Sequence, residues 1–210
     1  YKRQPNKDPD DGLDSEELKS LVDLSGHKLS DSNQGMLKGI LDLESVTVED
    51  IMIPRNEVRG LDLDDDIAVI TSSISESEYS RQPIYQGDIN NIVGVFHGRK
   101  AHLLLREEKI THETIKRFAE EAYFIPESTT LTTQLLNFKT AKKRFAVVVD
   151  EYGEVQGLVT LEDILEEIVG DFTTNTADSD DEVIYLSDNK YLIDGTATMR
   201  EINKLSLIHI

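Results

Sequence analysis

Hydrophobic residues near the N-terminus recur at the spacing of an amphipathic helix. Apolar residues follow Asp14 at positions 18, 21 and 22, and Glu17 stands three positions after Asp14, which is the spacing of a capping box. A second helix is predicted from Ser32 to Leu43, where apolar positions again fall on one face. Residues 1–13 are polar and contain proline and glycine, so we expect a flexible tether there.

From about residue 57 the pattern changes to short apolar strands that alternate with helices. The first half predicts a strand over 58–62, a helix over 67–74, strands over 84–85 and 92–96, and a helix near 98–105. The same order recurs as a strand over 123–125, a helix over 131–138, strands over 145–149 and 155–159, and a helix over 160–168. Because residues 145–149 are all apolar, we expect that strand to be buried on both faces.

This recurrence predicts two copies of a β-α-β-β-α unit of about 60 residues. An offset of 63 residues places Arg81 on Arg144 and Gly94 on Gly157, and one residue of slip in the preceding helix places Leu61 on Ile125. Each copy leaves one sheet face uncovered, so we expect the two to pack around a pseudo-twofold axis in an α+β fold.

The C-terminal part has a different character. A polar, acidic stretch precedes a predicted hairpin over 183–186 and 191–193, and a helix is predicted to begin at Met199. We therefore divide the chain into a tether with two helices, two repeats, an acidic linker and the start of a third, β-rich unit: 1–48, 49–110, 111–172, 173–182 and 183–210. The chain begins with Tyr1 rather than Met, so we expect a piece cut from a longer protein.

Composition narrows the classes of function. Asp and Glu total 41 against 22 Lys and Arg, giving a formal net charge of −19, which argues against nucleic acid or anionic lipid as a direct partner. Cysteine is absent, which excludes disulfides and thiol catalysis. The longest clean apolar run, Phe145 to Val149, is far shorter than the about 20 residues of a spanning helix, so we expect this piece to be soluble.

The most informative motif runs from Gly157 to Asp163, where a predicted strand enters a helix. Thr160 stands at the junction and Asp163 three residues later, so one interpretation is a capping box and nothing more. The other is a nucleoside site, because a carboxylate one turn into a helix can accept both hydroxyls of a ribose and Thr160 can reach the sugar or the α-phosphate.

The repeat and this motif together resemble a tandem CBS-domain pair, or Bateman module. In that family a Gly-h-h-Thr-x-x-Asp motif closes each adenosine pocket, which Gly157 to Asp163 match, and a strand ending in h-x-Pro lines the adenine, which Phe124, Ile125 and Pro126 match. The first copy has His97 and Lys100 where the second has Thr160 and Asp163. Lysine cannot accept from ribose hydroxyls, so the resemblance implies one working nucleotide site.

Three further segments resemble the CorC/CNNM family of hemolysin-like membrane proteins linked to magnesium and cobalt efflux: 51–55, 148–153 and 160–171. Residues 194–203 are similar to the start of that family's transporter-associated, CorC_HlyC domain. The resemblance implies a transmembrane domain preceding this region, a location at the cytosolic face of the bacterial inner membrane, and assembly as a homodimer.

Charged residues supply the remaining candidates. Arg81, in the segment Ser80-Arg81-Gln82-Pro83, is the preferred phosphate ligand because guanidinium can hold phosphate oxygens bidentately, although basic residues there could equally be solvated. Four carboxylates crowd the helix after Thr160, either as a charged face or as a site responsive to Mg²⁺, which could equally arrive as Mg-ATP. Metal ligands cannot be named, and we find no catalytic constellation.

We therefore expect a non-enzymatic regulatory module that binds ATP or AMP, with or without Mg²⁺, and passes its state to a membrane domain. One alternative is a dimerisation scaffold with a vestigial pocket. Another is a flavin-linked function, with FAD held by the complete C-terminal domain, because that domain of the family resembles a fold found in flavin-binding enzymes.

Overall fold

The computed structural model describes residues 13–24, 29–77, 79–106, 110–170, 183–187 and 190–193. The chain separates into two units, Tyr1–Gly170 and Asp171–Ile210, each of which is described by itself. Residues 1–12 of the predicted tether, the acidic linker and the helix predicted to begin at Met199 lie outside the described residues. Within the described part of the chain, no helix combines the length and apolar character needed to cross a membrane.

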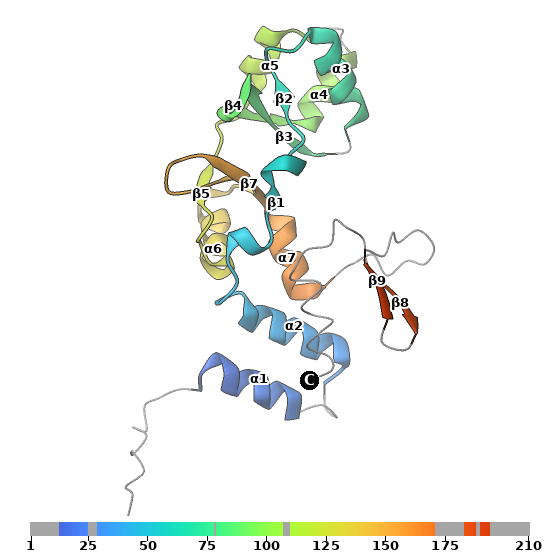
Figure 1. Ribbon diagram of the computed structural model, residues 1–210. Helices are drawn as coiled ribbons and strands as arrows, with labels where there is room; N and C mark the ends of the chain where they lie inside the picture. The colour runs from blue at the N-terminus through green and yellow to red at the C-terminus, as the bar shows by residue number, and fades with distance from the viewer. Residues whose placement is uncertain are drawn as a thin grey trace, which may run out of the picture. The chain divides into compact units, whose positions relative to one another are not determined.

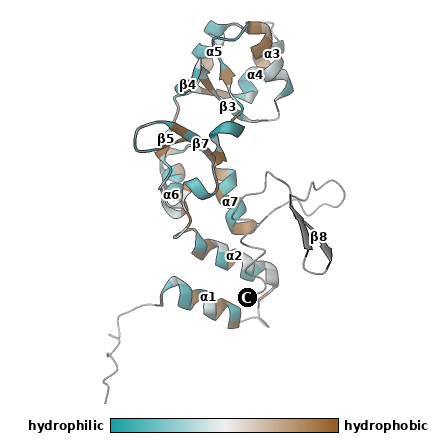
Figure 2. Cartoon of the chain, viewed as in Figure 1, coloured by the Kyte–Doolittle hydropathy of each residue, from teal (hydrophilic) through white to brown (hydrophobic). Residues whose placement is uncertain are grey.

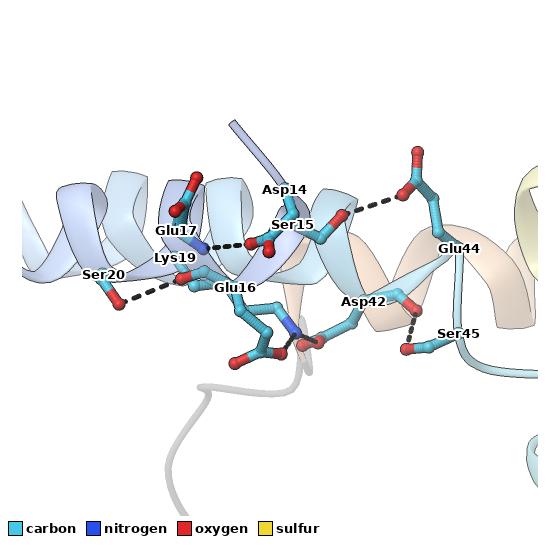
Figure 3. A network of polar contacts seen from close by, with 9 residues as sticks. All are labelled: Asp14, Ser15, Glu16, Glu17, Lys19, Ser20, Asp42, Glu44 and Ser45. Carbon is cyan, nitrogen blue, oxygen red and sulfur yellow. Dashed lines mark hydrogen bonds and ion pairs between the residues drawn. The ribbon is translucent and has the colours of Figure 1, made fainter. Parts of the chain in front are cut away.

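Two short antiparallel helices open the first unit, and both carry hydrophilic and hydrophobic residues (Figures 1 and 2). Helix α1 spans Ser15–Leu24 and α2 spans Asp31–Asp42. Asp14 accepts a hydrogen bond from the backbone N–H of Glu17 at 2.7 Å, as its predicted capping role requires. An ion pair of 2.9 Å between Lys19 and Asp42 links α1 to α2. Figure 3 shows this ion pair together with the hydrogen bond at Asp14. The predicted pair of helices is therefore confirmed.

The first repeat forms a three-stranded sheet in the order β2-β3-β4. Its elements are β2 (Leu61–Asp62), α3 (Ile67–Glu76), β3 (Arg81–Gln86), β4 (Asp88–His97) and α4 (Gly98–Arg106). Strand β2 runs parallel to β3, and β3 runs antiparallel to β4. The helices cover one face of this sheet around a core that includes Leu61, Ile84 and Phe96.

The second repeat repeats this order with β5 (Phe124–Pro126), α6 (Leu131–Ala141), β6 (Phe145–Val149), β7 (Val155–Thr160) and α7 (Leu161–Val169). Residues 145–148 are fully buried, so the prediction from their continuous apolar run is confirmed. Helix α5 (His112–Phe118) follows the first repeat in the sequence, and its Ile115 belongs to the core of that repeat. This helix was not predicted from the sequence. Its N-terminus is capped by Thr111, whose side chain accepts from the N–H of Thr114.

The two repeats exchange short segments at their sheet edges. Strand β1 (Ile53–Pro54) precedes the first repeat but pairs antiparallel with β7, giving a four-stranded sheet in the order β1-β7-β6-β5. Correspondingly, Glu120 precedes the second repeat and bridges to Val95 on β4. Short 3₁₀ turns flank β1, at Val48–Asp50 and Arg55–Glu57.

The uncovered faces of the two sheets pack on each other. The shared core contains Val95 from the first repeat with Phe145, Val147 and Leu158 from the second. Arg55 adds a polar link, because its guanidinium donates to Asn90 Oδ1 at 3.0 Å in one repeat and to the Val155 carbonyl at 3.1 Å in the other. The expected face-to-face packing of the repeats is confirmed.

The register of the strands corrects one part of the repeat alignment. Gly94 pairs with Ile84 and Gly157 pairs with Val148, so β3 and β6 are related by an offset of 64, whereas β4 and β7 are related by 63. Arg81 is therefore equivalent to Phe145 and not to Arg144. The extra residue lies in the β3–β4 hairpin, where bulges absorb it, and not in the preceding helix as the alignment assumed.

The second unit contains the predicted hairpin. Strands β8 (Val183–Ser187) and β9 (Lys190–Ile193) pair antiparallel. The identification of this hairpin as the start of a transporter-associated domain stays a prediction.

Candidate functional site

The N-terminus of α7 is built as the sequence predicts. Thr160 is its N-cap, with an extended backbone, and Asp163 Oδ2 accepts a hydrogen bond from the backbone N–H of Thr160 at 2.7 Å. The Thr160 hydroxyl accepts in return from the N–H of Asp163 at 3.3 Å. The predicted capping box is therefore confirmed.

Burial changes the acidity of this carboxyl group. Desolvation raises the pKa of Asp163 above its usual value, and the hydrogen bonds from Thr160 oppose that rise. The charged form of a partly buried carboxylate is stabilised by any further donor that reaches it. Hydroxyl groups of a ligand would supply such donors.

A pocket of about 230 Å³ lies beside this helix terminus, where the two repeats meet. Thr160 and Leu158 come from the second repeat, Arg81 comes from the first, and Ile53 comes from the exchanged strand β1. We call this the interface pocket; its remaining lining residues are Glu57, Arg59, Tyr79, Ser80, Phe145 and Glu162. Its lining therefore combines apolar surface with two guanidinium groups.

A second, more polar pocket of about 480 Å³ adjoins the interface pocket, and the two share Tyr79, Ser80, Arg81 and Glu162. We call it the arginine pocket, because Arg81, Arg99 and Arg144 all line it. His97 also lines it, and burial together with the charge of Arg81 lowers the pKa of that imidazole. In a chain of net charge −19, these residues form a local site for an anion.

The structure brings together some of the residues predicted for the site. Thr160 and Arg81 line the same pocket, whereas Asp163, three residues after Thr160, lines neither pocket. Phe124, Ile125 and Pro126 form β5, at the opposite edge of the sheet from β1, and they do not line either pocket. Their predicted contact with adenine stays a prediction.

The segment Met52-Ile53-Pro54 has the same h-x-Pro form and lies where Phe124 to Pro126 were expected. Ile53 lines the interface pocket, and a Cβ added to Gly157 would collide with the Ile53 carbonyl oxygen. Gly157 therefore makes room for β1, not directly for a ligand as the motif suggests. Sequence reasoning also missed Arg59 and Arg99, which no motif marks; the second h-x-Pro segment was the available signal for Ile53.

The equivalent place in the first repeat is filled differently. Lys100 is the third residue of α4, as Asp163 is of α7. Its Nζ forms an ion pair of 3.0 Å with Glu120 and donates to the Phe118 carbonyl at 3.2 Å. The hydrogen bond from Lys100 lowers the pKa of Glu120.

Metal ligands remain unassigned. In the part of the chain that the structure describes, no three His, Asp or Glu side chains gather in a way that could hold a metal ion. Glu162 is the carboxylate of α7 that lines both pockets, beside Arg81.

Comparison with known proteins identifies the family in which these features occur. Residues 115–170 match the model of the CBS domain. An inner membrane protein of Escherichia coli (strain K12) is 46% identical over 94% of this chain, and the chain spans 47% of that protein, about half its length. A magnesium and cobalt efflux protein CorC of Pasteurella multocida is 34% identical over 74% of this chain and 52% of its own length.

Two solved structures extend the similarity to folds with bound nucleotides. The CBS domain of a bacterial CNNM/CorC family Mg²⁺ transporter in complex with ATP is 34% identical, covers 66% of this chain and 98% of its own, and has a TM-score of 0.61. A CBS-domain pair with bound AMP from Klebsiella pneumoniae is 45% identical, covers 60% of this chain and 99% of its own, and has a TM-score of 0.57.

The relative that decides family membership is hemolysin C of Brachyspira hyodysenteriae. It is 30% identical over 91% of this chain, and the chain covers 69% of its length. Together with the exchanged-strand repeats and the segments at 51–55, 148–153 and 160–171, this similarity shows that the chain belongs to the CorC/CNNM family and contains its CBS-domain pair.

Proposed function

We propose that this chain is the nucleotide-binding regulatory module of a membrane magnesium or cobalt transporter, and that it is not an enzyme. The observation that carries the proposal is the interface pocket, where Thr160 of one repeat and Arg81 of the other line one cavity. A ligand that fills it contacts both repeats and β1 at once. Binding such a ligand therefore biases how these parts are arranged, to the extent that its affinity differs between arrangements.

The chemistry of the two pockets favours an adenine nucleotide. Apolar residues such as Ile53 and Leu158 suit a base, and the carboxylate of Asp163, in the first turn of α7, suits ribose hydroxyls. The neighbouring arginine pocket suits phosphates, because guanidinium groups bind phosphate oxygens bidentately. Mg²⁺ carried with ATP would lie beside Glu162 and reduce its repulsion of the phosphates.

A route from this site to the N-terminal helices supports a regulatory role. The nucleotide would bind at the first turn of α7, and the last turn of α7 packs against α2. A Cβ added to Gly39 on α2 would lie 2.5 Å from the Glu167 carbonyl oxygen, so the two helices touch closely. We propose that α7 passes the ligand state to α2, and from there to a membrane domain at the cytosolic face of the inner membrane.

Exposed apolar residues support the homodimer that the family resemblance implies. Leu136 on α6 is 57% exposed and Leu165 on α7 is 40% exposed. Leu165 also lines a pocket of about 510 Å³ with Leu135, Phe138 and Leu161, and four basic side chains complete the lining: Lys139, Lys142, Lys143 and Arg144. We propose that this face meets a second copy, which sedimentation at tens of micromolar would test: a monomer alone would contradict the proposal.

Calorimetric titration of the chain with ATP, AMP and adenosine tests the nucleotide function. Arg81→Ala should weaken ATP binding more than adenosine binding, by about tenfold or more, because a charge-assisted hydrogen bond contributes roughly 1.5–3 kcal/mol. Arg117→Ala is the matched control, because Arg117 packs over the Phe118 ring and lines neither pocket. Equal losses for ATP and adenosine would remove Arg81 from the phosphate site.

The dimerisation scaffold remains the competing function, and the exposed leucines favour it as much as they favour a regulated dimer. A scaffold with a vestigial pocket gives no heat with either nucleotide and no rise in melting temperature. A flavin-linked function concerns residues outside the described part of the chain. It stays a prediction that the colour of the purified full-length protein would test.

A further inference from the structure

Helices α4 and α7 hold equivalent residues that make opposite contacts. The carboxylate of Asp163 turns back onto its own helix terminus at Thr160. The ammonium of Lys100 reaches away from its helix to Glu120 and to the Phe118 carbonyl. These two partners lie on residues 118–120, the segment that precedes the second repeat and joins the sheet of the first.

This segment is the counterpart of β1. Glu120 and Val95 exchange two backbone hydrogen bonds, of 2.8 and 2.9 Å, as a short antiparallel bridge. A Cβ added to Gly94 would lie 2.8 Å from the Glu120 carbonyl oxygen, just as one added to Gly157 would collide with Ile53. Lys100 therefore ties its helix to the exchanged segment across the place where the other repeat has its interface pocket.

The second repeat has no such tie among the described residues. Asp163 makes no ion pair there, and Ile53, which pairs with Leu158 as Glu120 pairs with Val95, offers no charge. The volumes of the two pockets differ accordingly. The interface pocket has a volume of about 230 Å³, whereas the corresponding pocket beside Val95 and Glu120 has a volume of about 130 Å³. The site of the first repeat is smaller and has the ion pair of Lys100 with its lining residue Glu120, whereas the larger interface pocket has no ion pair between α7 and β1 among the described residues.

We propose that Lys100 is a built-in substitute for a ligand: its ammonium adds to the backbone bridge of segment 118–120 a side-chain contact that is always present, whereas β1, which is paired with β7 in any case, gains an equivalent contact with α7 only when a nucleotide fills the interface pocket. The part that concerns β1 rests on the proposed function. The ammonium also occupies the position where a ribose would need an acceptor. Nucleotide binding would thus change only the N-terminal side of the module, through β1 and α2.

Hydrogen–deuterium exchange on the full chain tests the proposal, with Lys100→Met as the variant because it keeps the length of the side chain and removes the charge. Without nucleotide, we expect the peptide covering 116–122 to exchange about 1.5- to fivefold faster than in the parent, the range for a half-exposed ion pair. The variant Lys100→Glu/Glu120→Lys should restore slow exchange. The control Lys116→Met should match the parent, because the Lys116 side chain is exposed and forms no ion pair with another described residue.

The same exchange experiment in the presence of ATP is the second test. In the parent, ATP should slow exchange of the peptide covering 50–58 and leave 116–122 unchanged. Unchanged exchange of 116–122 in Lys100→Met would overturn the role of Lys100. If calorimetry shows ATP binding but 50–58 does not respond, the inference about β1 fails while the nucleotide function stands. If ATP does not bind at all, the proposed function fails, and the result for Lys100 still decides its own part.

Discussion

The third residue of α4 is Lys100 and the third residue of α7 is Asp163, although both helices follow equivalent strands in the two repeats. The lysine reaches an acidic neighbour on the exchanged segment, and the aspartate caps its own helix. The same fold therefore carries one site with a smaller pocket and an internal ion pair, which we call the closed site, and one with a larger pocket and no such pair among the described residues, which we call the open site. Repeats of one fold need not share a function, because a single side chain at the site decides which partner is satisfied.

The largest expected effect comes from Gly157, which gives β1 its place on the second sheet. Gly157→Val should lower the free energy of unfolding by about 3 kcal/mol, because the new side chain collides with the Ile53 backbone. Urea denaturation measures the loss. Gly94→Val is the matched change in the first repeat, where Ala119 and Glu120 are the neighbours. A loss at Gly157 no larger than that of a surface substitution would show that β1 is not held there.

Asp163 tests whether the open site binds a ribose or only caps a helix. Asp163→Asn should weaken ATP or AMP binding by about ten- to a hundredfold, because the charged acceptor is lost. A cap without a ligand predicts instead a loss of about 1 kcal/mol in stability and unchanged affinity. Lys100→Ala, at the equivalent position, should change affinity little. Calorimetry and thermal melting on the same samples separate the two outcomes.

Gly39 tests how closely α2 packs on α7. Gly39→Ala should cost about 1–2 kcal/mol in stability, because its Cβ meets the Glu167 carbonyl and the Ile168 backbone. Gly35→Ala on the same helix meets nothing within 4 Å, and it should stabilise by about 0.5–1 kcal/mol through helix propensity. Urea denaturation reports both signs. Losses of equal size at the two glycines would contradict the close packing of α2 on α7.

The smallest effect concerns the pH dependence of the closed site. Lys100 lowers the pKa of Glu120 below its usual 4.5, so the ion pair stabilises the fold fully above that pH and loses its effect as the pH falls through the lower, folded value. Lys100→Met should therefore be less stable than the parent at neutral pH, and the difference should shrink below about pH 4.5. Urea midpoints across this range measure it. A difference that stays constant in acid would exclude Glu120 as the partner.

Local patterns were enough to predict most elements of the two repeats. The apolar run of β6 and the capping box of α7 each have a signal within a few residues, and both appear in the structure. Helix α5 was missed because its seven residues contain little periodicity and its cap pairs two threonines, not the usual Ser or Thr with Glu or Gln. Its detection needed the tertiary setting.

The sequence by itself determined the repeat, its helices and strands, the acidic character of the chain and the difference between Lys100 and Asp163. The tertiary structure alone decided that β1 pairs with β7 about a hundred residues away, and that Arg81, Ile53 and Thr160 line one pocket. Periodicity encodes which face of an element is buried, but a two-residue strand has no period and names no partner. The partners of such segments follow from which sheet edge is open and which glycine leaves room beside it.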